Sequence, residues 1–586
     1  MNSNLDTYIS DGTPERVRER YCRLSDLAKK ADFGALDENI VVIDTETTGF
    51  SFNHDELTQI AAARMEHGEV VDWYVTFVNP GKPIPDDVAH LTNIHDEDVA
   101  DAPTPDEALA GLVEFARDAK MVAHNAEFDR TFTTRHPSGY SLLDNIWIDS
   151  LDLARIALPR MKSHRLIDLV KAFGAPTSTH RADDDVAATC ALFRILLAAV
   201  HEMPPALVKC IALLAPVEQW NTAVVFQYFA QPEAKPFSLK ELRYESMTSY
   251  ERRPRIDAKM IQTMEYPTAE DIAQAFSPTG IVGKLYVDFD PREEQLTMAQ
   301  EVRAALEASE NLIVEAGTGV GKSMAYLVPA VLMAKKNNIA IGVATKTNAL
   351  LDQLVYHELP ALAQSLGDIT YAPLKGFSHY PCLRKVNRFV KEGVKMVDVQ
   401  GTEHSQAPSL GALLSFIDQT DYDDMDSLKM DYRVVPRRAV TTTSHDCLRR
   451  KCPFYGTTCF VHGARRFAET ADVVITNHTL LFCDAAADNG LLPPVRHWVL
   501  DEAHGAEAEA RRAFSLEIAA EDVTRLAQKV ASGESRNVYA RAERKLSSSL
   551  KNDGATLFEG LIGKAKSAGD MFAAAAHEFA PHIKDL

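Results

Sequence analysis

The stretch that decides the fold reads Asn39-Ile40-Val41-Val42-Ile43-Asp44-Thr45-Glu46. Its apolar part predicts a buried β-strand. Asp44 and Glu46 are two positions apart, so they project from the same face of that strand. Two like charges held close together repel, and burial adds a desolvation cost. Mg²⁺ or Mn²⁺ bound between the oxygens removes that penalty. A solvated strand end is the alternative, so further motifs must decide.

Length and composition restrict the class of protein. The chain has 586 residues and a net charge of −21, which argues against a protein that is basic throughout, while local basic grooves stay compatible. No signal-peptide pattern and no apolar run of about 18 residues occur. Eight cysteines in such a chain indicate metal ligands or free thiols rather than disulfides. We expect a cytoplasmic protein without a membrane partner.

The patterning along the chain predicts an α/β protein with several parts. We expect a charged helical extension over residues 1–37, a mixed α/β domain over 38–200, a connector over 201–285 and a nucleotide-binding α/β domain over 286–586. Within the first α/β domain, two apolar runs between residues 59 and 77 predict a β-hairpin.

Two later motifs extend the acidic pair. The first ends at Asp129, and the second contains His180 and, five residues later, Asp185. In this order and spacing the motifs resemble the DEDDh exonucleases, the DnaQ-like family with a ribonuclease-H-like fold. The resemblance covers about residues 38–200 and implies a metal-dependent 3′→5′ exonuclease. The acidic residues that it assigns to the metal ions are Asp44, Glu46, Asp129 and Asp185.

The implied chemistry explains these residue types. Four carboxylates can hold two Mg²⁺ or Mn²⁺ ions, which generate the attacking hydroxide and stabilise the leaving oxygen. His180 would be the general base, because the pKa of a histidine lies near neutrality. The alternative is that His180 is a surface loop residue. His124 and Asn125 either contact the substrate or support a strand-to-helix turn.

A phosphate-binding loop is predicted near the middle of the chain. Leu312–Ser323 reads as a strand, a glycine-rich loop and the start of a helix, with Ala316 in place of the first glycine of the Walker A pattern. Backbone N–H groups would bind phosphates, Lys322 would reach the β and γ phosphates, and Ser323 would bind Mg²⁺. The predicted ATP-binding residues are Gly317, Thr318, Gly319, Gly321, Lys322 and Ser323.

Two further segments resemble superfamily 2 helicases. Asp501-Glu502-Ala503-His504 follows an apolar run and resembles their motif II. The resemblance implies that Asp501 holds Mg²⁺ and that Glu502 positions or deprotonates the attacking water. Phe289–Gln295 resembles their adenine-reading segment, with Gln295 as the base contact.

Four cysteines lie between the two ATPase motifs. Four thiolates suit zinc or a [4Fe–4S] cluster, and unligated thiols are the third reading. An insertion of this kind, here over about residues 375–465, resembles the XPD/DinG helicases, which implies the iron–sulfur cluster. The cysteines are Cys382, Cys447, Cys452 and Cys459.

Basic and aromatic side chains interleave in the same insertion. The mixture predicts a groove for single-stranded nucleic acid, and the alternative is a solvated charged face over core aromatics. The basic residues are Lys375, Arg384, Lys385, Arg388, Arg449, Arg450, Lys451, Arg465 and Arg466; the aromatic residues are Phe377, Tyr380, Phe454 and Tyr455.

The helicase resemblance stops after motif II. Residues 505–586 predict only helices, which resemble the start of an arch domain, and no second motor domain with its arginine finger follows. We therefore expect an exonuclease for DNA with a single strand or a free 3′ end, in repair or replication, whose ATP-binding part does not unwind DNA alone. The alternatives are a helicase completed in trans by a separate second motor chain and a non-catalytic DNA-binding or regulatory module.

Overall fold

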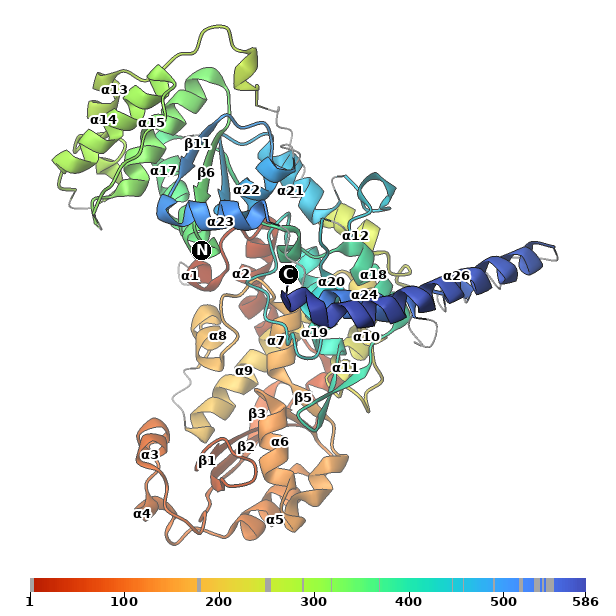
Figure 1. Ribbon diagram of the computed structural model, residues 1–586. Coiled ribbons are helices and arrows are strands. Elements are labelled where there is room, and N and C mark those ends of the chain that lie inside the picture. Colours follow the sequence, from red (N-terminus) through yellow and green to blue (C-terminus); the bar gives the residue numbers. More distant parts are fainter. Residues whose placement is uncertain are drawn as a thin grey trace. The chain divides into compact units, whose positions relative to one another are not determined.

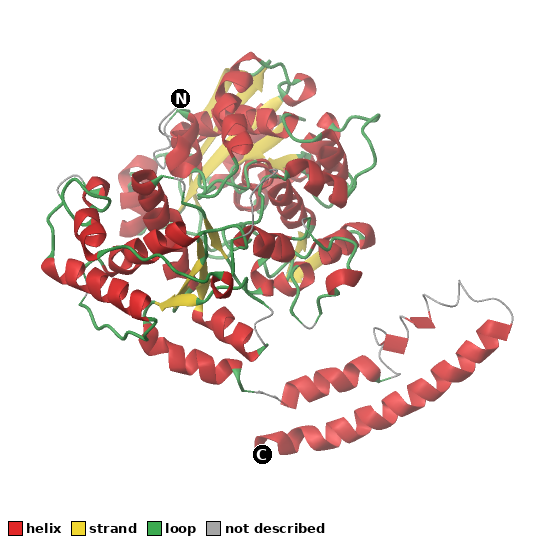
Figure 2. Cartoon of the chain, turned by 90° about the horizontal axis from the view of Figure 1, so that it is seen from above, coloured by secondary structure: helices red, strands yellow, loops and turns green. Residues whose placement is uncertain are grey.

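The computed structural model describes most of the chain in two compact units (Figures 1 and 2). The first comprises Met1–Leu481 and Asn489–Ala503, and the second comprises Phe482–Asp488 and His504–Leu586. The described residues are 5–176, 181–247, 255–286, 289–317, 319–367, 369–444, 446–456, 458–487, 491–515, 520–531, 538–539, 542–543 and 553–585.

A five-stranded mixed sheet organises the N-terminal part of the first unit, in the order β3-β2-β1-β4-β5. Figure 1 labels four of its strands, β1, β2, β3 and β5. The central strand β1 pairs antiparallel with β2 and parallel with β4. The expected hairpin is confirmed, since β2 and β3 pair antiparallel. The strands are β1 (Ile40–Thr47), β2 (Leu57–Glu66), β3 (Glu69–Phe77), β4 (Lys120–Ala123) and β5 (Trp147–Asp149).

Helices cover both faces of this sheet, because the apolar first half of its central strand is buried on both sides, with Ile40 and Val42 in one core cluster and Val41 and Ile43 in another. The long helix α9 contacts β1 and β2, and α5 contacts β2 and β3. Helix α5 starts in a capping box between Thr104 and Glu107. The helices around this sheet are α3 (Asp86–Thr92), α4 (Asp96–Val99), α5 (Pro105–Ala116), α6 (Ala126–Thr134), α7 (Ser150–Ala157), α8 (Leu166–Phe173) and α9 (Ala182–His201).

A second sheet has four parallel strands in the order β11-β6-β10-β7. Parallel strands joined through helices are typical of nucleotide-binding α/β domains. The strands are β6 (Ile341–Thr345), β7 (Tyr371–Pro373), β10 (Val473–Asn477) and β11 (His497–Leu500). The helices of this region include α13 (Ala269–Ala275), α14 (Glu293–Ala308), α15 (Lys322–Asn337), α16 (Asn348–Gln353) and α17 (Leu359–Leu366).

One apolar core joins the first sheet to the cysteine-bearing insertion within the first unit. Leu24 of helix α2 and Phe193 of α9 belong to the same buried cluster as Phe416 and Phe460 of the insertion. Helices α10 to α12, in the expected connector, contribute buried side chains to this core. The helices named here for the first time are α1 (Leu5–Tyr8), α2 (Glu15–Lys30), α10 (Pro205–Ala212), α11 (Ala223–Phe229), α12 (Leu239–Ser246), α18 (Leu383–Glu392), α19 (Ala407–Asp418), α20 (Arg437–Val440) and α21 (Phe460–Ala468).

Buried polar contacts fix this junction. The Arg160 guanidinium, whose side chain is 2% exposed, pairs with Asp423 at 2.6 Å and donates to the Thr13 hydroxyl at 3.0 Å. The Tyr21 hydroxyl donates to Gln419 at 2.6 Å. Because a buried charge is tolerated only when paired and hydrogen-bonded, these contacts select one docking geometry.

The second unit is helical where it is described. Helix α24 packs against α26 through Ala527, Ala573 and Ala576. Its helices include α23 (Ala506–Ala513), α24 (Ala520–Val530) and α26 (Asp553–Phe579). Over the described part of the chain, no single helix is long and apolar enough to cross a membrane. Only α9 and α10 among the described helices, taken together as a bent pair, have the length and composition of a membrane span.

Candidate active site and cofactor sites

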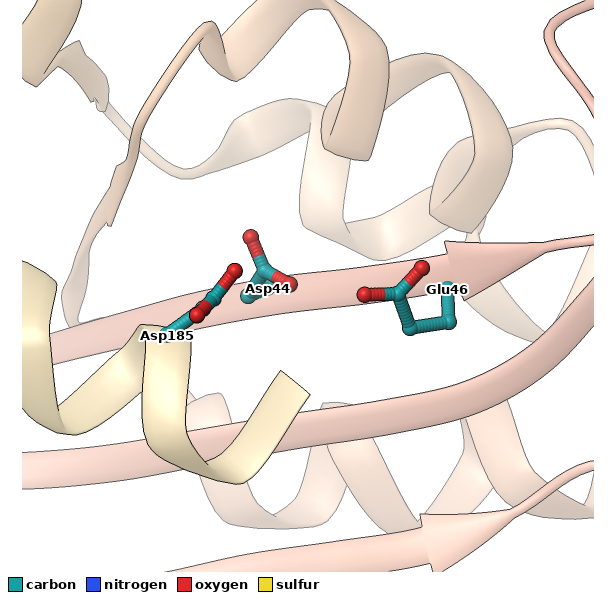
Figure 3. Close-up of side chains that lie close together, drawn as sticks. All are labelled: Asp44, Glu46 and Asp185. Carbon is teal, nitrogen blue, oxygen red and sulfur yellow. The ribbon is translucent and has the colours of Figure 1, made fainter. Parts of the chain in front are cut away.

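Three of the four predicted acidic residues meet at one point on the first sheet (Figure 3). Asp44 and Glu46 come from β1, and Asp185 comes from the first turn of α9. One carboxylate oxygen from each lies within 4.8 Å of the others, and the side chains point toward one another. This spacing suits a divalent cation bound by several oxygens.

Asp129, the fourth predicted acidic residue, is buried on α6 beside this group. Its Oδ1 atom accepts a hydrogen bond from the Thr45 hydroxyl at 2.8 Å, and its charge acts on Asp44. Strand β1 therefore supplies Asp44 and Glu46, and the Thr45 hydroxyl between them orients the Asp129 carboxylate. The structure thus clusters three of the four predicted acidic residues and places Asp129 close enough for its charge to act on Asp44.

Burial and mutual repulsion raise the pKa of these carboxyls. Burial, followed by the charges of Asp185 and Asp129, raises the pKa of Glu46 to about 8. Burial raises the pKa of Asp129 to about 7, and burial followed by the Asp129 charge holds the pKa of Asp44 well above its usual range. Carboxyl groups that resist ionisation in this way are stabilised in their charged form when a bound cation replaces the protons.

Other predicted contacts have different outcomes. His180, the predicted general base, lies outside the described residues. The His124 ring is half-buried and held at both nitrogens, with Nδ1 2.9 Å from the Ser150 hydroxyl and Nε2 2.9 Å from the His164 carbonyl oxygen. Burial lowers the pKa of His124 to about 4, so its ring is neutral. His124 therefore supports the turn before α6. The Asn125 N–H donates to Asp149, which also stabilises this turn.

An aromatic cluster beside the acidic residues was missed by the sequence analysis. Phe50 is 84% exposed and Phe52 is 41% exposed on the loop that follows β1. The Phe50 ring centroid lies 6.2 Å from that of Phe128, and the Phe52 centroid lies 5.3 Å from that of Phe132. The two aromatic residues in Gly49-Phe50-Ser51-Phe52, directly after the acidic motif, were the available signal.

The predicted phosphate loop lies next to the motif II residues. Gly319 and Gly321 have φ of +82° and +83°, a left-handed conformation that glycine adopts without a steric penalty. Helix α15 begins at Lys322. The Nζ atom of Lys322 lies 3.4 Å from Glu502 Oε1. The Tyr326 hydroxyl donates to Asp501 at 3.3 Å.

Gln295, the predicted adenine contact, also reaches this loop. Its Nε2 donates to the Gly321 carbonyl oxygen at 2.9 Å. Gly317 and Ser323 flank the loop as expected from the chain order, while Thr318 lies outside the described residues. The segments predicted to bind ATP and to contact adenine therefore meet at the start of α15.

The strand expected before the phosphate loop is not formed, and that prediction is wrong. Residues 311–317 have no strand conformation, and the Ile313 side chain is 96% exposed. The described sheet has the order β11-β6-β10-β7, and this segment pairs with none of its strands. An apolar sequence favours a strand only when a neighbouring strand accepts its backbone hydrogen bonds.

The four predicted cysteine ligands line one small pocket with apolar walls. Cys382 precedes α18, and the other three lie on the segment that leads into α21. The Arg449 backbone N–H donates to Cys447 Sγ at 3.4 Å. An all-sulfur donor set in an apolar pocket fits either an iron–sulfur cluster or zinc. His462 lines the same pocket and was missed, because a lone histidine carries no spacing signal.

The predicted groove residues divide into two groups. The Lys375 side chain is 2% exposed and pairs with Asp352, Asp424 and Asp426 at 3.0, 2.8 and 3.2 Å. Lys375 is therefore a buried ion-pair residue, and its assignment to a groove is wrong. Arg449, Arg450 and Lys451 are exposed, as a phosphate-binding surface requires.

Comparison with known proteins defines the class of the first domain. Residues 41–193 match the model of the exonuclease family. With the ribonuclease-H-like sheet and its acidic residues, this match establishes an exonuclease domain, whose chemistry implies a divalent metal ion. The α/β fold expected from the sequence is confirmed.

The particular relatives are DinG proteins. The chain is 28% identical over 490 residues to the 3′-5′ exonuclease DinG of Bacillus subtilis, covering 81% of this chain and 50% of that protein. It is 24% identical over 488 residues to the protein of the same name from Staphylococcus aureus, covering 82% and 52%. The similarity to DinG proteins that the motifs predicted is confirmed. The chain spans about half the length of these relatives.

Solved structures give shorter matches. Exonuclease X in complex with 5′ overhanging duplex DNA is 26% identical, with a TM-score of 0.23, over 27% of this chain and 90% of that chain. Escherichia coli exonuclease I in complex with a dA16 oligonucleotide is 22% identical, with a TM-score of 0.25, over 31% and 46%.

Proposed function

We propose that this chain is a 3′→5′ exonuclease that hydrolyses DNA from a free 3′ end with two Mg²⁺ or Mn²⁺ ions. The observation that carries the proposal is the convergence of Asp44, Glu46 and Asp185 within 4.8 Å in a domain that matches the exonuclease family. The names of the relatives support the direction of digestion.

The residues of the site have separate tasks in this proposal. Bound metal ions would supply an activated water and stabilise the leaving oxygen. The carboxylates of Asp44, Glu46 and Asp185 would hold these ions. The Thr45 hydroxyl donates a hydrogen bond to Asp129 and thereby orients that carboxylate. His180 accepts the proton of the attacking water in this proposal. The support for that role is the position of His180 in the sequence motif.

Single-stranded DNA is the substrate that the surroundings favour. The exposed Phe50 and Phe52 rings stand next to the acidic strand and offer faces for stacking. An unpaired base can stack on such rings, whereas a paired base has to leave its duplex first. The hydroxyls of Thr47 and Thr48 donate to Gly49 and Asp55, so substrate contacts of this loop come from its rings and backbone.

A nuclease assay tests the proposal. The full chain with Mn²⁺ should release nucleotides from the 3′ end of labelled single-stranded DNA, and Asp44→Asn should reduce the rate by about 10³-fold or more, since a ligand of the catalytic ions is lost. Asp183→Asn is the matched control on the same helix turn as Asp185. The absence of release by the parent chain, with Mg²⁺ or Mn²⁺, would refute the proposal and favour a non-catalytic DNA-binding module.

We propose in addition that Lys322, Ser323 and Asp501 bind ATP with Mg²⁺ and that the four cysteines hold a [4Fe–4S] cluster. The contact of Lys322 with Glu502 and the shared pocket of the cysteines support these assignments. Iron and sulfide analysis of anaerobically purified protein tests the cluster. Zinc in their place would refute it. A nuclease with these parts suits DNA repair or replication.

A helicase completed in trans is the second candidate. The observation that favours it is the exposed Leu312-Ile313-Val314 segment, which pairs with no strand of the sheet that ends in β11. Apolar residues left outside a sheet gain free energy when a further strand covers them. ATP-dependent strand displacement should then need an added second motor chain. Unwinding by this chain alone would contradict that reading.

A further inference from the structure

His462 lies against the pocket of the four cysteines. Its Nε2 atom is 3.8 Å from Cys447 Sγ, a distance at which an N–H group can hydrogen-bond sulfur. The side chain lines the same pocket as Cys382, Cys452 and Cys459. Nothing in the exonuclease or ATP chemistry described above uses this imidazole.

The orientation of the His462 ring is fixed by its neighbours. Its centroid lies 4.6 Å from that of Tyr455 and 6.5 Å from that of Phe377. The residue lies in the first turn of α21, and Cys459 immediately precedes that helix. The imidazole is therefore placed by the same helix start that places a cysteine.

We propose that His462 donates its Nε2–H to the Cys447 sulfur and thereby raises the reduction potential of the iron–sulfur cluster. The inference rests on the [4Fe–4S] cluster proposed above. A reduced cluster carries one more negative charge, much of it on sulfur, so a donor to a sulfur stabilises the reduced state more than the oxidised state. His462 contributes through Cys447, which makes it a positioning residue for the cluster rather than a catalytic one.

Two substitutions separate the hydrogen bond from the packing. His462→Phe keeps an aromatic ring against Tyr455 and removes the donor, whereas His462→Gln keeps an N–H group at nearly the same distance along the side chain. Both are made in the full chain and purified without oxygen. The readouts are iron and sulfide per chain and the midpoint potential, from a mediated titration of the electron paramagnetic resonance signal of the reduced cluster.

We expect the parent, His462→Gln and His462→Phe to hold equal iron, and His462→Phe to have a lower midpoint potential that His462→Gln largely restores. Equal potentials in the parent and His462→Phe would overturn the inference, as would a potential of His462→Gln that matches His462→Phe. Loss of iron in both variants would make His462 a ligand and would also overturn it. A parent with zinc and no iron would refute the cluster itself, which distinguishes the two failures.

Discussion

Replacement of Asp44 by asparagine should stabilise the metal-free protein while it abolishes nuclease activity. The carboxylates of Asp44, Glu46 and Asp185 lie within 4.8 Å of one another. Two unit charges at that distance repel by about 3 kcal/mol at an effective dielectric constant of 20. Because protonation already relieves part of this repulsion, we expect Asp44→Asn to raise the free energy of unfolding by about 2 kcal/mol at pH 8 in EDTA.

The pH dependence gives the sign of the effect. Glu46 and Asp129 have folded-state pKa values near 8 and 7, above the values of about 4 for unfolded carboxyls. The folded metal-free protein therefore binds more protons than the unfolded chain between these limits, so its stability falls as the pH rises from about 4 to 8. At pH 5.5 both groups are protonated, and the gain from Asp44→Asn should nearly vanish.

Thermal unfolding in EDTA at pH 5.5 and pH 8 measures this. A gain of about 2 kcal/mol raises the midpoint by a few degrees. Asp183→Asn should show no such gain, since Asp183 pairs with Arg181 instead. Added Mg²⁺ should reverse the order at pH 8, because the parent binds the metal more tightly. A destabilised Asp44→Asn at pH 8 in EDTA, or an equal gain at both pH values, would refute the reasoning.

Three further perturbations test individual contacts. Thr45→Val removes the donor to Asp129 and should lower nuclease activity about tenfold with a higher Mn²⁺ requirement, measured by metal titration; an unchanged requirement would argue against orientation by Thr45. Arg160→Met removes the buried partner of the half-buried Asp423 carboxylate and should cost about 3 kcal/mol in denaturant unfolding, whereas an intact midpoint would mean that the pair contributes little. Lys375→Met should lower the melting midpoint and leave the salt dependence of DNA binding unchanged; a reduced salt slope would return Lys375 to a DNA-binding surface.

The acidic site was predictable because the positions of its residues depend on short-range features of the sequence. Asp44 and Glu46 share a strand face by the two-residue period, and Asp185 opens a helix, so each position follows from short-range geometry. The role of His124 was not predictable, because its partners, Ser150 and the His164 carbonyl, come from distant parts of the chain. Only the folded structure shows that both ring nitrogens are engaged.

The remaining errors have a common physical origin in long-range pairing. Lys375 has the sequence environment of a surface lysine, and three acidic residues from separate segments bury it. The stretch around Ile313 has the composition of a strand, but strand formation depends on pairing with a neighbour, and this stretch pairs with no strand of the described sheet. Composition and spacing cannot report partners far along the chain.

The core shared by α2, α9, α19 and α21 limits how this polypeptide can be divided. Proteins with two enzymatic signatures are often regarded as independent modules on a flexible tether, which recombination can exchange. Here a cut after α9 would uncover apolar surface on both products and would separate Arg160 from Asp423. The nuclease and the cysteine-bearing insertion are expected to unfold together and to be inherited together, so a substitution on one side of the junction constrains the sequence of the other.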